Sequence, residues 1–159
     1  TCMFRSAVIN GHQQDNADCG NCEIYEYPES KPNEVYFDGA HNTAGIEEFL
    51  KTVRQIGGKK PLLLFSMVKE KDYAAVVRML SRTDWGGIVV THIPDARGLS
   101  VAALQEEFEK NGKETVGIND CRAAYDGVMQ KKEPGQTVFC TGSLYLIGEL
   151  EKIAGGLKK

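Results

Sequence analysis

Apolar residues alternate along most of this chain between short continuous runs and stretches with helical spacing. From Glu34 onward, continuous apolar runs predict buried strands, and apolar positions three or four residues apart predict helices. The predicted strands are 35–37, 61–67, 87–91, 114–118 and 137–141. The predicted helices are 44–56, 72–82, 101–110, 120–132 and 144–153. A strand–helix unit that occurs five times in succession predicts a mainly parallel sheet with helices on both faces.

The first 33 residues are less regular than the rest of the chain. Short strands are predicted at 7–9 and 23–27, and the polar stretch 10–21 between them reads as a loop or an insertion. We therefore expect an irregular lead-in with edge strands at 1–33, followed by one α/β domain at 34–159. The expected fold is a Rossmann-like open sheet of about five or six strands.

Polar and reactive residues gather where the predicted strands end. In a parallel sheet, the loops that follow the strands emerge at one edge, and ligands bind there. The candidates at this edge include Asp38, Gly39, His41, Asn42, Lys71, Asp72, Asp95, Arg97, Thr141, Gly142, Ser143 and Tyr145. The opposite edge carries ordinary turns such as 57–60 and 133–135. The asymmetry predicts a ligand site at the carboxyl ends of the strands.

The loop after the last strand is suited to an anion. Gly142 allows a sharp turn and a close approach of the backbone to a ligand. Ser143 stands at a predicted helix N-cap, where free N–H groups and the helix dipole favour a carboxylate or phosphate. In the first loop, Asp38 suits a ribose hydroxyl or an ammonium group, and His41 suits a carboxylate or phosphate. The alternative interpretation is an ordinary serine cap, a turn-forming aspartate and a surface histidine.

Composition narrows the class of protein. A net charge of −3 and a pI of about 5.7 without a basic stripe argue against nucleic-acid binding. No apolar run approaches the roughly 20 residues of a membrane-spanning helix. Of the five cysteines, Cys121 and Cys140 are expected in the core, and Cys19 and Cys22 have zinc-like spacing but no second pair of ligands. We therefore expect no metal site and a reducing, cytoplasmic compartment.

Two sequence motifs for nucleotide binding and one for a catalytic nucleophile are absent from the sequence. It contains no P-loop, no glycine-rich dinucleotide fingerprint and no nucleophile elbow. The chain is thus expected to carry a ligand edge without a complete set of catalytic residues.

The motifs, taken in order, resemble a known family. The segment 38–42 (Asp-Gly-Ala-His-Asn), Lys71-Asp72, Arg97 and the segment 141–145 (Thr-Gly-Ser-Leu-Tyr) are similar to the C-terminal domain of folylpolyglutamate synthase/dihydrofolate synthase, within the Mur ligase family. The resemblance covers roughly residues 34–153. Thr43 departs from it, because the family usually has Pro there, which would set the helix start more rigidly.

The resemblance implies an ATP-dependent ligase that adds L-glutamate to a folate carboxylate through an acyl phosphate. It implies a monomer in which ATP and Mg²⁺ are held mainly by a larger N-terminal P-loop domain, so that this domain is inactive alone. It assigns nucleotide binding to Asp38, His41 and Arg5, and glutamate binding to His41, Ser143 and Tyr145. Gly39, Asn42, Lys71, Asp72, Arg97 and Gly142 are supporting residues.

Two other functions stay open from the sequence. The chain could be a stand-alone module that binds a nucleotide or an amino acid, or part of another Mur-type amino-acid ligase. The segment Ser143-Leu144-Tyr145 favours the folate branch over the latter.

Overall fold

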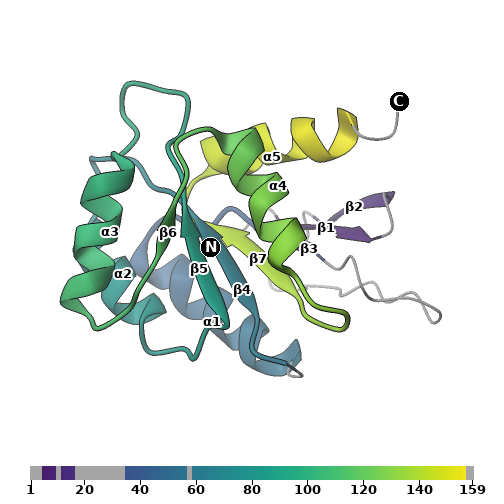
Figure 1. The fold of residues 1–159 in the computed structure, drawn as a ribbon, viewed down its shortest axis with the longest axis horizontal. Coiled ribbons are helices and arrows are strands. Elements are labelled where there is room, and N and C mark those ends of the chain that lie inside the picture. Colours follow the sequence, from purple (N-terminus) through teal and green to yellow (C-terminus); the bar gives the residue numbers. More distant parts are fainter. Residues whose placement is uncertain (1–4, 10–11, 17–34, 57–58, 157–159) are drawn as a thin grey trace.

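In the part of the chain that the structure describes, one mixed sheet of seven strands lies in the order β2-β1-β3-β7-β4-β5-β6 (Figure 1). The computed structural model describes residues 5–9, 12–16, 35–56 and 59–156. The strands are β1 (Arg5–Ile9), β2 (His12–Asn16), β3 (Val35–Asp38), β4 (Leu62–Phe65), β5 (Gly87–Val90), β6 (Val116–Gly117) and β7 (Val138–Thr141). Strands β3 to β7 run parallel to one another, and β1 and β2 form an antiparallel pair beyond β3.

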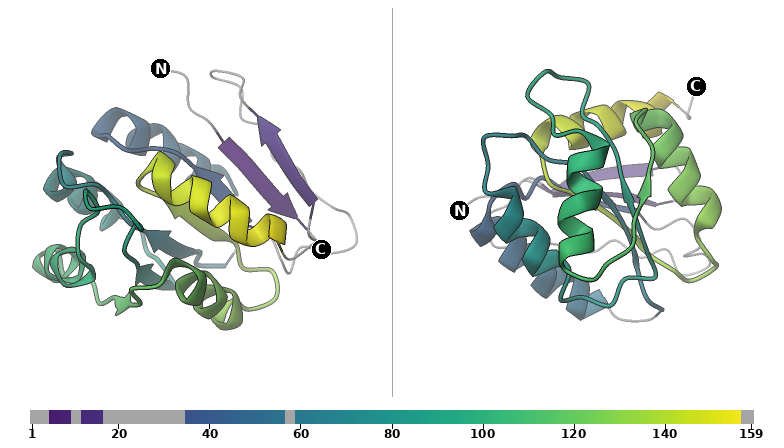
Figure 2. Two further views of the ribbon diagram at one scale, coloured as in Figure 1. Left: turned by 90° about the horizontal axis from the view of Figure 1, so that it is seen from above. Right: turned by 60° about the vertical axis from the view of Figure 1, so that its left-hand side comes forward.

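Helices cover both faces of the sheet (Figure 2). They are α1 (Thr43–Ile56), α2 (Tyr73–Leu80), α3 (Val101–Lys110), α4 (Cys121–Lys131) and α5 (Leu144–Gly156). Side chains alternate between faces along a strand, so Leu63 and Phe65 of β4 join a core with α1, α2 and α3. Leu62 and Leu64 join a second core with α4 and α5. Burial on both faces explains why the strand sequences are continuous apolar runs.

Most of the predicted elements are confirmed. The five predicted parallel strands and the five helices all form, with ends that differ by a few residues. Ser100 caps α3 as predicted, since its side chain accepts a hydrogen bond from the Ala103 N–H at 3.1 Å. Cys121 and Cys140 are buried free thiols, as expected, and burial raises the pKa of both.

The lead-in differs from the prediction. The expected loop at 10–21 is wrong in part, because β2 lies within it and pairs with β1. Its sequence, His-Gln-Gln-Asp-Asn, has no apolar alternation, and an edge strand can form by backbone pairing without it. The hairpin brings the sheet to seven strands instead of five or six. The predicted strand at 23–27, together with Cys19 and Cys22, lies outside the described residues.

The last strand of the sheet is shorter than expected. The prediction of 114–118 reduces to two residues, Val116 and Gly117. Val116 is 44% exposed, so little apolar burial favours a longer strand at this edge. None of the helices in the described ranges is long and apolar enough to cross a membrane.

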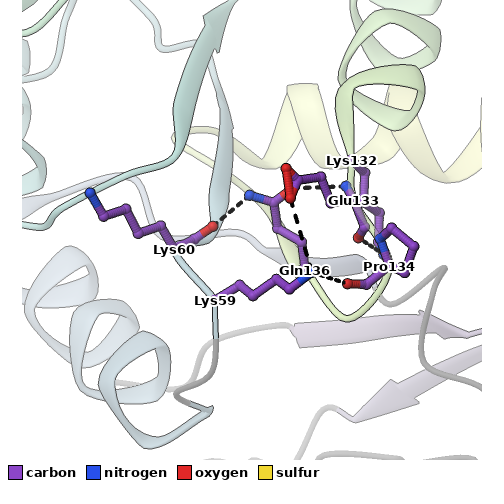
Figure 3. A network of polar contacts seen from close by, with 6 residues as sticks. All are labelled: Lys59, Lys60, Lys132, Glu133, Pro134 and Gln136. Atoms are coloured by element: carbon purple, nitrogen blue, oxygen red, sulfur yellow. Dashed lines mark hydrogen bonds and ion pairs between the residues drawn. The ribbon is translucent and has the colours of Figure 1, made fainter.

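The edge at the amino ends of the strands is held by a polar network (Figure 3). The Gln136 side chain donates to the Lys60 carbonyl at 2.6 Å and accepts from the Glu133 N–H at 2.9 Å. Lys59 Nζ donates to the Pro134 carbonyl at 2.8 Å. The network joins the segment before β4 to the loop between α4 and β7. Hydrogen bonding explains the polar residues at this edge, in agreement with the prediction of ordinary turns there.

Candidate functional site

The two motifs that stand about 100 residues apart in the sequence are neighbours in the sheet. Strands β3 and β7 are parallel and adjacent, with Asp38 opposite Thr141. Beyond the strand ends, the Gly142 N–H donates to the Ala40 carbonyl at 3.0 Å, and the Thr141 hydroxyl donates to the same oxygen at 3.4 Å. The loops after β3 and β7 therefore form one continuous surface.

The first loop is folded by its own polar side chains. Asp38 is 4% exposed, and its carboxylate accepts a hydrogen bond from the Ala40 N–H at 3.0 Å. Asn42 caps α1, since its side-chain oxygen accepts from the Gly45 N–H at 2.8 Å. His41 Nδ1 lies 2.9 Å from the Gly39 carbonyl, and this contact requires a proton on Nδ1. In the neutral ring, Nε2 then carries a lone pair for a ligand.

The second loop presents the start of α5. Gly142 has φ of +120°, and a Cβ at this position would collide with the Ser66 carbonyl and lie 2.7 Å from the Phe65 ring. Ser143 is the N-cap, because its hydroxyl oxygen accepts from the Tyr145 N–H at 3.1 Å and its carbonyl accepts from the Ile147 N–H. The serine cap predicted from the sequence is confirmed, and the hydroxyl proton remains available to a ligand oxygen.

The loops after β4 and β5 are joined to each other. Val68 and Gly98 form an antiparallel bridge, and the Lys69 N–H donates to the Arg97 carbonyl at 2.8 Å. This pairing keeps the loop that carries Arg97 beside the loop that carries Lys71.

The Arg97 side chain is held by an acid on one side and an aromatic ring on the other. Asp95 accepts hydrogen bonds from Arg97 Nε at 3.1 Å and from Nη2 at 3.3 Å. The guanidinium carbon lies 4.4 Å from the centre of the Tyr145 ring, a cation–π arrangement. The hydrogen bonds to Asp95 raise the pKa of Arg97, and they lower the pKa of Asp95. The two hydrogen bonds and the ring contact together orient the guanidinium group.

These loops surround a cleft of about 380 Å³. It is lined by His41, Val68, Glu70, Lys71, Arg97, Ser143, Leu144 and Tyr145. The structure thus brings together five predicted residues from four loops, namely His41, Lys71, Arg97, Ser143 and Tyr145. Lys71, the capping serine Ser143 and Arg97, which also pairs with Asp95, give the cleft groups that bind an anion.

The other predicted residues do not line the cleft. Asp38, Gly39, Asn42, Asp72 and Gly142 are absent from its lining. Asp72 caps α2 by accepting from the Ala75 N–H at 3.2 Å. Arg5 lies in β1 directly opposite Asp38 in register.

Glu70 extends the candidate site beyond the predicted residues, because it lines the cleft. Asp95, which the sequence predicts at the same edge, does not line the cleft but contacts it through Arg97. Within the described ranges, no group of three or more His, Cys, Asp or Glu side chains could hold a metal ion.

Comparison with known proteins identifies the family of this chain. Residues 24–144 match the family model described as "Mur ligase, glutamate ligase domain". The dihydrofolate synthase/folylpolyglutamate synthase of Bacillus subtilis is 29% identical over 119 residues, which are 74% of this chain and 27% of that protein. A probable dihydrofolate synthetase of Schizosaccharomyces pombe is 25% identical over 126 residues, covering 74% of this chain and 30% of that protein. The chain therefore spans less than a third of the length of these relatives.

Solved structures share the fold. Escherichia coli FolC in complex with DHPP and ADP has a TM-score of 0.74 and 19% identity, covering 82% of this chain and 30% of that one. Mycobacterium tuberculosis folylpolyglutamate synthase, complexed with ADP and AMPPCP, has a TM-score of 0.69 and 22% identity, covering 77% and 30%. At these identities the likeness concerns the fold, whereas the family match covers most of the sequence. The chain belongs to the Mur ligase family and carries its glutamate ligase domain.

Proposed function

We propose that this chain is the C-terminal domain of an ATP-dependent ligase that adds L-glutamate to a folate carboxylate through an acyl phosphate. The observation that carries the proposal is the cleft, which is lined by Ser143 at the start of α5 and by Lys71 and Arg97. A helix N-terminus and two cations form a site for a carboxylate of the incoming amino acid. The similarity to folylpolyglutamate and dihydrofolate synthases supports glutamate as that amino acid.

In this proposal, Ser143 and Tyr145 bind the glutamate together with His41. The Ser143 hydroxyl donates to a glutamate carboxylate, and Arg97 contributes positive charge from its fixed position above the Tyr145 ring. Glu70 at the same cleft provides a carboxylate for the substrate ammonium group. The His41 Nε2 atom accepts a hydrogen bond or, when protonated, donates one to a phosphate or carboxylate oxygen.

The nucleotide side of the site is assigned to Asp38, His41 and Arg5. Asp38 and Arg5 are opposite each other in the register of β3 and β1, so an acidic and a basic residue stand at the same end of the sheet. We assign the P-loop and Mg²⁺ to a further domain of the same protein, since these 159 residues contain no P-loop. A structure of a bifunctional folylpolyglutamate synthase/dihydrofolate synthase that shares this fold is described with Mn, AMPPNP and L-glutamate bound, which is compatible with a nucleotide and glutamate as ligands. The functional protein is proposed to be a cytoplasmic monomer.

A direct experiment tests the ligase. The full coding sequence that contains these 159 residues is expressed, and ATP-dependent incorporation of labelled glutamate into tetrahydrofolate is measured. We expect the wild-type protein to be active. In Ser143→Ala and in His41→Ala, kcat/KM should fall at least about tenfold, which corresponds to a loss of about 1.4 kcal/mol of transition-state stabilisation. Ser81→Ala is the matched control outside the cleft. An inert full-length protein that still binds ATP or glutamate would favour the stand-alone binding module.

A further inference from the structure

A second cavity lies between α1 and α2, outside the cleft at the strand ends. Its volume is about 770 Å³, against about 380 Å³ for the cleft. One end is lined by Thr43, the first residue of α1, and the other by Arg82, Thr83 and Asp84 beyond the end of α2. Because Thr43 is only two residues from His41, the groove begins beside the candidate site.

Three arginines line the groove, Arg54 on α1 and Arg78 and Arg82 at and beyond the end of α2. Within the described part of the chain, their guanidinium groups form no ion pair or hydrogen bond. Lysines on three helices instead pair with a glutamate three residues earlier, as Lys51 does with Glu48 at 3.2 Å. The arginines are therefore exposed charges without the local partners that these lysines have on α1, α3 and α5.

The groove gathers positive charge at one end. Arg78 lies in the last turn of α2, and Arg82 follows the C-cap residue Ser81. Of the two acids in the lining, Asp84 already pairs with Lys60 at 3.2 Å, which leaves Glu47 at the other end. In a chain with a net charge of −3, this groove concentrates positive charge. An anionic ligand would supply the partners that these arginines lack.

We propose that the groove binds a carboxylate-rich chain, which, resting on the proposed function, is the γ-linked oligoglutamate tail of the folate substrate. Arginine forks bind carboxylates in a bidentate manner, and Leu50 and Met79 provide apolar surface for the methylene groups between them. Helix α1, with 14 residues, is about 21 Å long, so the groove beside it accommodates several glutamate units. Its start at Thr43 places the tail next to the site where the chain grows.

The binding test uses the protein itself and a defined probe. Calorimetry measures the affinity of γ-linked pentaglutamate for the wild-type protein and for Arg78→Glu/Arg82→Glu, at low and at physiological salt. Arg122→Glu on α4, on the opposite face of the sheet, is the control with the same change in charge per residue. We expect the double variant to bind at least about tenfold more weakly, the control to stay within about twofold, and binding to weaken with salt.

Three outcomes overturn the proposal. Absence of binding, or unchanged binding in the double variant, removes the groove as the site. Equal or tighter binding of α-linked pentaglutamate indicates an acidic segment of a protein instead of the substrate tail. Arg78→Gln/Arg82→Gln, with folding checked by circular dichroism, replaces the charge-reversed variant if that variant unfolds.

A kinetic comparison separates this proposal from the proposed function. In the full-length enzyme, the double variant should raise the KM for pentaglutamyl tetrahydrofolate at least about tenfold while the KM for the monoglutamyl form stays within about twofold. If the wild-type enzyme extends monoglutamyl folate but the double variant changes the KM of both substrates equally, the proposed function stands and the groove is refuted as the tail site. A wild-type protein that extends neither substrate refutes the proposed function, and the calorimetry still decides the groove.

Discussion

Replacing Gly142 by alanine tests the close approach of the loop after β7 to the strand beside it. The added Cβ would meet two kinds of obstacle, the Ser66 carbonyl and the Phe65 ring at 2.7 Å. Both belong to the end of β4 and the residue after it, which is buried and cannot move freely. The backbone at φ of +120° is also one that an alanine rarely adopts.

The expected cost is the sum of these two effects. An unfavourable backbone conformation costs about 1–3 kcal/mol, and overpacking against a fixed neighbour costs about 1–3 kcal/mol. We therefore expect Gly142→Ala to lower the free energy of unfolding by about 2–6 kcal/mol, a large part of the roughly 5–15 kcal/mol typical of a domain. At about 3 kcal/mol, the midpoint of thermal unfolding would fall by roughly 6–12 °C.

Two matched variants separate the causes. Gly112 has φ of +77° but no atom within 4 Å of an added Cβ, so Gly112→Ala should show the backbone cost alone, about 1–2 kcal/mol. Gly148 lies in α5 with no atom within 4 Å and no positive φ. Gly148→Ala should therefore be neutral or stabilise the protein by up to about 1 kcal/mol.

The assay is urea denaturation followed by the fluorescence of Trp85, the single tryptophan, which is 8% exposed in the core. Gly142→Ala should be the least stable of the three variants. A loss of less than about 1 kcal/mol, or a loss no greater than that of Gly112→Ala, would contradict the close approach of the two loops.

Three further predictions concern the core, the amino-end network and the arginine at the cleft. Phe139→Ala should cost about 3–5 kcal/mol in urea denaturation, because its ring is 1% exposed and lies 5.6–6.3 Å from three aromatic rings; a cost below about 1 kcal/mol would disprove the packing. Gln136→Ala should cost about 1–3 kcal/mol, since two backbone groups lose their partner, whereas exposed Gln130→Ala should change stability by less than about 0.5 kcal/mol. The hydrogen bonds from Arg97 lower the pKa of Asp95 below its usual 3.8. The stabilisation that the pair gives the folded state should therefore be complete above pH 3.8 and should be lost as the pH falls through the lowered pKa. An NMR titration of the Asp95 carboxyl with a midpoint at or above 3.8 would refute this prediction.

Much of the fold follows from local patterns that a reader can find in the sequence. The continuous run at 61–67 predicts a strand buried on both faces, and β4 is one. Ser100 and Ser143 predict helix starts, and each hydroxyl oxygen accepts the expected backbone N–H. These features depend on residues within a few positions of one another, so sequence spacing is sufficient to predict them.

Where the prediction failed, the deciding contacts lay outside the local pattern. Strand β2 is polar throughout, and its existence depends on pairing with β1 at the edge of the sheet. Likewise, the exposed position of Val116 limits β6, although its β-branched side chain favours a strand.

The sequence by itself determined which residues end the strands, which of them cap helices, and that they share one edge of a parallel sheet. Only the tertiary structure decided that β7 lies between β3 and β4. That order joins Ala40 to Gly142 and places Tyr145 under Arg97. The packing of α1 against α2, which the tertiary structure also decided, creates the groove that both Arg54 and Arg78 line. Local patterns define elements through backbone bonding and burial periodicity, but the choice of neighbours depends on contacts between distant segments, which no short stretch of sequence contains.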